Sequence, residues 1–389
     1  MIKKSVLALR DLLFTACVSI RNIFKGSNKK IIVGFVASQK TGITGSAKPL
    51  FEELLNDDRF VAYWVYPKAN EKKLFAEKNY NAYYKRSFYR IGLYVKTDIW
   101  ITTHGSFGIP INYNKHHSKR IELWHGIPFK GFLKENKDKI VKDFNQASTV
   151  VVTSNFFITL FSEKWGVDKE ILRDLGQPRT DMLINNILSK DKIKKDLGIK
   201  QSKVILYAPT HEQDLKEDKL LFPWNENKTF KTVIDTIGEN TALIIRPHPY
   251  WKEKISEYIQ EKIEHDERIY YMPAKKINNT EKLIYISDVL ITDWSSIYFD
   301  FLLMKKPTIF LNLQNPFEDQ FVMKPEERVG YLASNEKELS EHLHEALNNL
   351  SKYYDSFNQK LKKLIEKVYT KTDGKATERC INEIIRLSK

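Results

Sequence analysis

The feature that most constrains the fold of this chain is the regular alternation of short apolar runs with segments of helical spacing. Apolar runs separated by helices are typical of βαβ units, which build parallel sheets. The alternation occurs twice, once on each side of a polar interval. The predicted strands cover 29–36, 61–66, 99–103, 120–123 and 149–153 in the first set and 204–207, 242–246, 268–271, 289–292 and 308–311 in the second.

Two consecutive α/β sets predict two Rossmann-like domains that face each other across a cleft. A length of 389 residues suits two domains of ordinary size. The lysine-rich stretch 189–203 is the expected linker, and residues 336–364 and 376–387 have helical spacing. The predicted parts are an N-terminal helix over 1–28, an N-terminal domain over 29–195, a C-terminal domain over 196–370 and a C-terminal helix over 371–389.

The net charge of +14 and the sequence pI near 9.3 predict an anionic partner, which could be a nucleic acid, an anionic lipid or a phosphorylated substrate. A generally basic surface with no single partner is the alternative. No pattern of a known nucleic-acid-binding module accompanies the charge, so a nucleic acid is not expected. Cys17 and Cys380 lie far apart without CxxC spacing, which indicates a reducing cytoplasm. No HExxH motif and no DxD-type acidic pair in a suitable loop is present, so no structural metal and no cofactor are expected, while dependence on a divalent ion stays open.

Residues 1–28 predict a basic amphipathic helix. Its apolar residues recur at steps of three and four, at Ile2, Val6, Leu9, Leu13, Ala16, Ile20 and Ile23. No early run reaches the roughly 18–20 apolar residues of a membrane-spanning helix, and Arg10 and Asp11 interrupt any signal-peptide core. The apolar stripe either packs on the body of the protein or lies in a membrane interface with its basic flanks on anionic headgroups.

Ligands of open α/β sheets bind beyond the carboxyl ends of the strands, so polar residues directly after predicted strands are candidate site residues. His125 follows one strand and precedes Gly126, which leaves its imidazole open to take a proton from a hydroxyl. A structural histidine satisfied by backbone groups is the alternative. Thr210 follows another strand, where it either binds a ligand or caps a turn.

Two further segments of the second set carry groups that suit phosphate. Arg246 and His248 stand two apart in a proline-fixed loop, an arrangement that suits a diphosphate, although a rigid loop with an exposed arginine is the alternative. Asp293 ends a strand that leads into a helix beginning near Ser295 and Ser296. The free N–H groups and positive dipole of such a helix start bind phosphate, whereas a plain N-cap needs no ligand.

Taken together, five segments resemble the CDP-glycerol glycerophosphotransferases, which include teichoic acid primases and polymerases and relatives from capsule gene clusters. The segments are 124–130, 176–181, 207–210, 246–248 and 291–301, in the order seen in that family. The resemblance covers about residues 31–311. It implies an α/β fold of the GT-B type, with the donor nucleotide held mainly by the C-terminal domain, and peripheral association with the inner face of the membrane.

Residue by residue, the resemblance implies that His125 is the general base and that His248 is a second essential histidine beside the donor diphosphate. The expected donor-binding residues are Arg246, Thr210, Asp293, Ser295 and Ser296, and the expected acceptor-side residues are Gly126 and Lys130. Residues 211–214 read His-Glu-Gln-Asp, where family members often have a tryptophan followed by Arg-Asp-Asp. This departure leaves the choice between glycerol and ribitol open.

The sequence thus predicts an enzyme that transfers glycerol phosphate from CDP-glycerol to a lipid-linked, polyanionic cell-surface polymer, either a teichoic acid or a capsule, and releases CMP. The reaction is expected at the cytoplasmic face of the membrane, on an anionic surface. A CDP-ribitol-dependent transferase and a glycosyltransferase that uses a nucleotide sugar are alternatives. A non-catalytic, membrane-bound assembly protein is a third.

Overall fold

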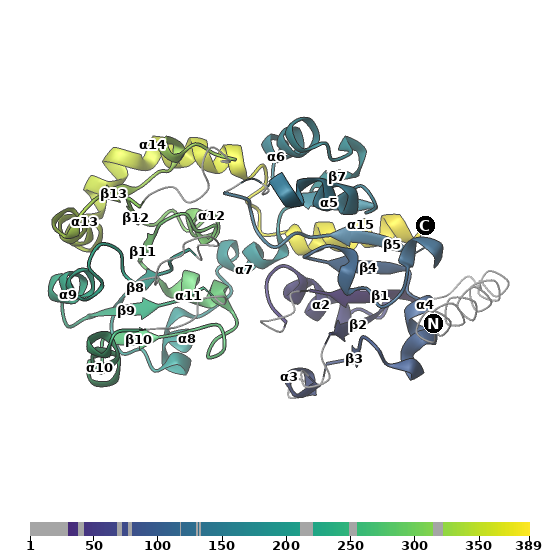
Figure 1. The fold of residues 1–389 in the computed structure, drawn as a ribbon, viewed down its shortest axis with the longest axis horizontal. Coiled ribbons are helices and arrows are strands. Elements are labelled where there is room, and N and C mark those ends of the chain that lie inside the picture. Colours follow the sequence, from purple (N-terminus) through teal and green to yellow (C-terminus); the bar gives the residue numbers. More distant parts are fainter. Residues whose placement is uncertain are drawn as a thin grey trace. The chain divides into compact units, whose positions relative to one another are not determined.

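The computed structural model describes residues 30–37, 43–67, 72–76, 80–116, 118–129, 131, 134–210, 221–248, 255–313 and 322–389. This part of the chain forms two compact units (Figure 1). Unit 1 takes in the described chain up to residue 125, 134–179 and 375–389, and unit 2 takes in 126–131 and 180–374. The amphipathic helix predicted for residues 1–28 lies outside the described residues.

Unit 1 contains a seven-stranded sheet in which every neighbouring pair is parallel. In spatial order its strands are β3 (Ala82–Tyr84), β2 (Phe60–Tyr66), β1 (Ile31–Val36), β4 (Ile99–Thr102), β5 (Lys119–Glu122), β6 (Thr149–Val152) and β7 (Leu172–Asp174). This is the strand order of a Rossmann fold. The central strands are apolar and buried, as expected for parallel strands covered on both faces.

Helices cover the sheet of unit 1. They are α2 (Ala47–Leu55), α3 (Lys72–Ala76), α4 (Ile91–Val95), α5 (Lys134–Phe144), α6 (Asn155–Thr159) and α15 (Ala376–Ser388). The C-terminal helix α15 packs on α2, β4 and β5, and its Cys380, Ile381 and Ile384 belong to the main core of the unit. The C-terminal helix expected as a separate part is therefore an integral layer of unit 1.

Unit 2 contains a six-stranded parallel sheet of the same topology. In spatial order its strands are β10 (Ile269–Tyr271), β9 (Thr241–Ile245), β8 (Lys203–Tyr207), β11 (Val289–Thr292), β12 (Thr308–Leu311) and β13 (Tyr331–Ala333). Its helices are α7 (Asp181–Ile184), α8 (Lys190–Leu197), α9 (Glu226–Thr236), α10 (Glu257–His265), α11 (Thr280–Ile286), α12 (Ile297–Leu302), α13 (Glu336–Asn348) and α14 (Leu350–Val368). The predicted α/β fold with two parallel sheets is confirmed.

Two details of the second half differ from the prediction. The stretch 189–203, expected to be a linker, forms α8, which Ser189 caps by accepting from Lys192 N, and Ile193 is buried in the core. The stretch 336–364, expected to be helical, forms two helices that meet at Asn349, whose side chain accepts from Lys352 N. An asparagine side chain that satisfies the first turn of a new helix favours such a break.

Candidate active site

Each sheet has a switch point, where the strand order reverses and ligands of α/β proteins bind. In unit 1 it lies between β1 and β4, and in unit 2 between β8 and β11. His104 follows β4 and His125 follows the adjacent β5, while Thr210 follows β8 and Asp293 follows β11. The polar residues singled out by the sequence therefore stand at the carboxyl edges of both sheets.

His125 is an exposed histidine whose backbone is fixed on both sides. Its Nδ1 lies 3.4 Å from the carbonyl oxygen of Thr103, and its own carbonyl accepts from Arg179 Nη1 at 2.8 Å. Trp124 before it has a left-handed backbone with φ of 58°, which a bulky side chain adopts at a cost of about 1–3 kcal/mol. If Nδ1 carries the proton toward Thr103, Nε2 keeps the lone pair that a general base needs.

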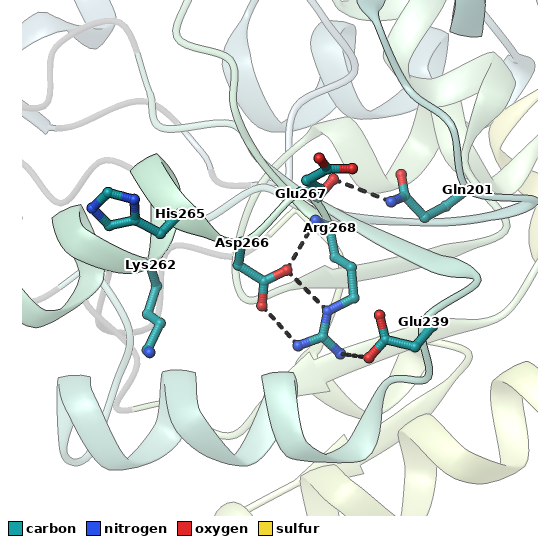
Figure 2. A pocket seen from close by; sticks show the side chains of 7 residues that line it. All are labelled: Gln201, Glu239, Lys262, His265, Asp266, Glu267 and Arg268. Atoms are coloured by element: carbon teal, nitrogen blue, oxygen red, sulfur yellow. Dashed lines mark hydrogen bonds and ion pairs between the residues drawn. The ribbon is translucent and has the colours of Figure 1, made fainter.

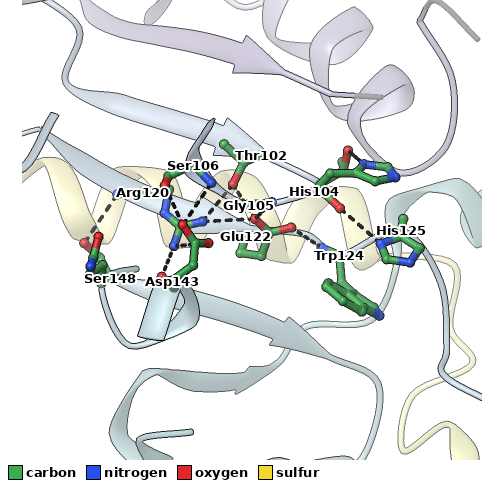
Figure 3. A network of polar contacts seen from close by, with 12 residues as sticks. Thr102, His104, Gly105, Ser106, Arg120, Glu122, Trp124, His125, Asp143 and Ser148 are labelled. Atoms are coloured by element: carbon green, nitrogen blue, oxygen red, sulfur yellow. Dashed lines mark hydrogen bonds and ion pairs between the residues drawn. The ribbon is translucent and has the colours of Figure 1, made fainter. Parts of the chain in front are cut away.

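A second imidazole, that of His104, lies against His125. The two rings are nearly parallel, with centroids 4.6 Å apart and planes 16° from each other (Figure 3). Desolvation lowers the pKa of His104 to about 4. The side chain is exposed, so contact with solvent opposes this desolvation. The pKa of His104 therefore lies below its usual value, which favours the neutral ring.

A buried carboxylate, that of Glu122, holds the loops that carry both histidines. Its Oε2 accepts from Gly105 N at 3.0 Å and from Thr102 Oγ1 at 2.6 Å, and its Oε1 accepts from Trp124 N at 3.1 Å (Figure 3). The bonds to Gly105 and Trp124 fix the residue next to each histidine. Glu122 is fully buried, and burial raises the pKa of its carboxyl, while the charge of Arg120 opposes the rise.

The fully buried Arg120 connects this carboxylate to a second one on α5. Its Nη1 lies 3.1 Å from Glu122 Oε2 and its Nη2 lies 3.1 Å from Asp143 Oδ2. Asp143 in turn accepts from Ser106 N at 3.1 Å and from the Ser106 hydroxyl. The Arg120–Glu122–Asp143 network therefore anchors the start of the segment after β4, at Thr102, Gly105 and Ser106, and the start of the loop after β5, at Trp124.

The chain passes from unit 1 to unit 2 between His125 and Gly126. Gly126 is buried in unit 2, and Phe129 farther along packs on Trp294 and Phe299, with ring centroids 5.9 and 5.4 Å away. The expected acceptor-side glycine is thus part of the unit that carries the expected donor site, and its segment contacts the residue next to Asp293. Lys130 lies outside the described residues.

Thr210 and Asp293 join the ends of β8 and β11 at the switch point of unit 2. Thr210 N lies 2.9 Å from Asp293 Oδ1, and the Thr210 hydroxyl donates to the same oxygen. Burial raises the pKa of the Asp293 carboxyl, and the bonds from Thr210 oppose the rise. Arg328, which the sequence did not single out, stacks over Trp294 at 4.1 Å with Nη1 3.5 Å from the Asp293 carbonyl oxygen. Desolvation lowers its pKa to about 10.

The remaining donor-side candidates lie at the same edge. Ser295 is partly exposed and Ser296 is exposed, and Ser296 stands at the N-cap of the six-residue α12 without a side-chain capping bond. The Ser296 side chain therefore does not cap α12. His248 follows β9 and is partly buried. These side chains share the carboxyl edge of the sheet with Thr210 and Asp293.

Arg246 is built into its own loop. It is buried, and Nη1 donates to the carbonyl oxygens of Met272 at 2.9 Å and Ile277 at 2.5 Å, while Nη2 donates to Thr280 Oγ1 at 2.9 Å. Desolvation lowers its pKa to about 10, and Glu281 opposes this. The guanidinium group of Arg246, which suggested a diphosphate ligand, thus holds the segment between β10 and α11 in place.

A cavity of about 560 Å³ lies at the other edge of the second sheet (Figure 2). Its lining residues precede strands or end α10 and are Gln201, Glu239, Lys262, His265, Asp266, Glu267 and Arg268. Arg268 forms ion pairs with Asp266 at 2.7 Å and with Glu239 at 3.8 Å, so carboxylates of the cavity wall neutralise its charge. The cavity stands apart from the switch point and from the residues described above.

Two searches of the described residues complete the description of the site. No group of three or more histidine, cysteine, aspartate or glutamate residues in this part of the chain is placed to hold a metal ion. Likewise, none of the described helices combines the length and apolar character needed to cross a membrane.

Two sheets of Rossmann order, each with polar residues at its switch point, define an α/β protein of two Rossmann-like units. The chain belongs to the CDP-Glycerol:Poly(glycerophosphate) glycerophosphotransferase family, whose model matches residues 18–386. It is an enzyme of that transferase family, and the resemblance noted from its motifs is confirmed.

Named relatives make polymers of both alditol phosphates. Teichoic acid ribitol-phosphate polymerase TarK of Staphylococcus aureus (strain NCTC 8325 / PS 47) is 23% identical over 397 residues, which cover 97% of this chain and 72% of TarK. A teichoic acid poly(glycerol phosphate) polymerase of Bacillus spizizenii is 24% identical over 364 residues, 85% of this chain and 88% of that protein. The solved structure of wall teichoic acid polymerase TagF matches with a TM-score of 0.75 and 19% identity, over 100% of this chain and 97% of TagF.

Besides Arg328, three residues of the candidate site around His125 were not predicted from the sequence. His104 carries the same signal as His125, a histidine followed by glycine directly after a strand. Glu122 and Arg120 alternate with apolar residues in a short strand, a pattern typical of a half-exposed strand rather than of a buried ion pair. Their pairing depends on Asp143, which belongs to a different element.

Proposed function

We propose that this chain transfers glycerol phosphate from CDP-glycerol to a hydroxyl group of a lipid-linked teichoic acid or capsule polymer and releases CMP. One observation carries the proposal beyond family membership. The exposed imidazole of His125, at the carboxyl edge of the first sheet, has its Nδ1 facing a carbonyl oxygen, an arrangement that suits a general base. The carboxyl edge of the second sheet gathers hydroxyl groups and His248 around its switch point, a place suited to a nucleotide diphosphate.

In the proposed reaction His125 acts on the acceptor. Its Nε2 takes the proton of the acceptor hydroxyl while that oxygen attacks the β-phosphorus of the donor. A new P–O bond forms to the acceptor, the bond between the β-phosphorus and the bridging oxygen breaks, and CMP leaves with its electron pair. Such a transfer depends on positioning and on charge stabilisation more than on covalent chemistry of the protein.

Unit 2 holds the donor in this proposal. The free hydroxyl of Ser296, the neighbouring Ser295 and His248 stabilise charge on the diphosphate, with the N–H groups at the start of α12. Thr210 and Asp293 set the shape of the edge through their mutual hydrogen bonds. Arg246 contributes by fixing the loop between β10 and α11, because its terminal nitrogens are bonded there.

A ribitol donor is the second candidate, because the named relatives include a ribitol-phosphate polymerase that matches 97% of this chain. Transfer from a nucleotide sugar is the third. A panel of CDP-glycerol, CDP-ribitol and UDP-sugars, with a short phosphoalditol acceptor and mass analysis of the product, separates them. We expect CMP release and a mass gain of one or more glycerol phosphate units. Transfer from a UDP-sugar alone would overturn the proposal.

We also propose that the enzyme works at the cytoplasmic face of the membrane, held there by the basic residues 1–28 and by the charge of +14. Co-sedimentation with anionic vesicles, with and without residues 1–26, checks this. Binding that the deletion abolishes while the melting temperature stays unchanged is the expected result. Unchanged vesicle binding with a sharply lower melting temperature would assign the segment to the body of the protein.

A further inference from the structure

His104 stacks on His125 but has no role in the proposed reaction. The rings come from loops after neighbouring strands, β4 and β5, and lie 4.6 Å apart and nearly parallel. A single carboxylate fixes both loops, because Glu122 accepts from Gly105 N and Trp124 N at 3.0 and 3.1 Å. Figure 3 shows both rings at the same end of this network. The fold thus holds the two imidazoles face to face.

We propose that His104 is a positioning residue for His125, whose ring it holds in the orientation and the neutral state that proton abstraction requires. The inference rests on the proposed function, in which His125 is the general base. His104 acts through His125 and is not assigned any contact with the substrate.

The hydrogen bonds around Thr103 give the two rings complementary roles. The Thr103 carbonyl oxygen faces Nδ1 of His125 at 3.4 Å, whereas the Thr103 hydroxyl lies 2.8 Å from Nδ1 of His104. A proton on Nδ1 of His125 leaves its Nε2 basic. The Thr103 hydroxyl can donate to or accept from Nδ1 of His104, so it holds that ring in either tautomer. One residue thus bonds both imidazoles, and its carbonyl oxygen, which can only accept, favours the proton on Nδ1 of His125.

Charge favours the same arrangement. Two stacked imidazolium rings repel each other, so the pair accepts one proton more readily than two. Desolvation lowers the pKa of His104, which leaves that ring neutral. In the described part of the chain, the charged groups bonded to the His125 segment include Arg179, which donates to its carbonyl, and Glu122, which holds Trp124 with Arg120 and Asp143 behind it. His104 stacks on His125 nearly parallel, and the indole of Trp124 lies 4.1 Å from the same ring at 40°.

Three substitutions separate the possible contributions of His104. His104→Phe keeps an aromatic face but removes the bond to Thr103, His104→Asn keeps a polar atom near Thr103 but removes the face, and His104→Ala removes both. His342→Ala is the matched control, because His342 also stacks on an aromatic ring, that of Tyr331, at 4.5 Å and 4°, in unit 2. Circular dichroism and thermal melts establish that each variant is folded.

The readouts are the pH profile of the transfer rate and the donor dissociation constant. For His104→Ala we expect a turnover loss of about 10- to 100-fold, the scale of a misplaced catalytic group, with donor affinity unchanged. Its acidic limb should move to higher pH by about half a unit, because the loss of the stacked ring opens more of His125 to solvent and favours its protonated form. His104→Asn should follow His104→Ala, and His104→Phe, which keeps the aromatic face but loses the bond to Thr103, should lose less turnover than either. His342→Ala should change neither readout.

The failure of this inference differs from a failure of the proposed function. If the wild type releases no CMP from any CDP-alditol, the proposed function is wrong. The titration of the His125 ring, followed by NMR in labelled protein with the same variants, still tests the role of His104. An unshifted His125 titration in His104→Ala overturns the inference, as does wild-type turnover with an unmoved acidic limb. An equal loss in His104→Phe and His104→Ala would also overturn it.

Discussion

The buried carboxylate of Glu122 makes the sharpest prediction about the site. Glu122→Gln keeps the shape of the side chain but replaces one acceptor oxygen with an N–H₂ group. Every partner of this carboxylate is a donor, namely Thr102 Oγ1, Gly105 N, Arg120 Nη1 and Trp124 N. The amide oxygen of the glutamine can stand at only one of the two oxygen positions. The N–H₂ group then occupies the other position and faces the backbone N–H of Gly105 or of Trp124, which is left without an acceptor.

The magnitude follows from what is left unpaired. A buried donor without an acceptor costs about 1–3 kcal/mol, and removing one partner of a buried ion pair costs about 3–5 kcal/mol. Arg120 keeps Asp143 Oδ2 at 3.1 Å, which retains part of its pairing. We therefore expect Glu122→Gln to lower the free energy of unfolding of unit 1 by about 3 kcal/mol, with the loops of His104 and His125 loosened first.

Urea unfolding followed by tryptophan fluorescence measures the loss, and hydrogen exchange at Gly105 and Trp124 locates it. Glu267→Gln is the matched control, because Glu267 forms an exposed ion pair with Lys200 at 2.8 Å. That variant should unfold like the wild type. Equal stabilities of the two variants, or exchange at Gly105 and Trp124 as slow as in the wild type, would refute the role given to Glu122.

Two further predictions concern unit 2. Burial lowers the pKa of Lys306 from 10.5 to about 8, so the unfolded chain binds this proton more tightly and wild-type stability should rise between pH 8 and 10.5. Lys306→Met should flatten that rise, and parallel urea-stability curves for the two proteins would contradict it. Arg246→Lys should lower the melting temperature, because one ammonium group cannot span Met272, Ile277 and Thr280. An unchanged melting temperature with weakened donor binding would instead place Arg246 on the donor.

The fold was predictable from the sequence because buried parallel strands are continuous apolar runs. The three strands that the prediction lacks, β3, β7 and β13, have three residues each and lie at sheet edges, where so short a run carries no period. Residues 189–203 were read as a linker because lysines dominate them, yet one stripe with Ile193 suffices to pack α8. The lysine-rich composition suggested a linker, but the narrow buried face with Ile193 is enough to form a packed helix.

The candidate site was predictable to the extent that chain position determines it. His125, Thr210 and Asp293 follow strands, and parallel strands bring their carboxyl ends to one edge. The hydrogen bonds of Arg246 were not predictable, because its partners are the backbone carbonyl groups of Met272 and Ile277 in a distant loop. A sequence shows which side chains carry donors, but only the packed loop shows which acceptors they meet.

The most direct test of the central claim compares wild-type enzyme with His125→Ala in the release of CMP from a CDP-alditol, with and without a phosphoalditol acceptor. Turnover at saturating donor should fall at least about a hundredfold, the usual scale for a lost general base. Donor affinity measured by calorimetry should stay within about twofold, because the proposed donor site belongs to unit 2. Undiminished turnover in His125→Ala, or a collapse of donor affinity, would contradict the account.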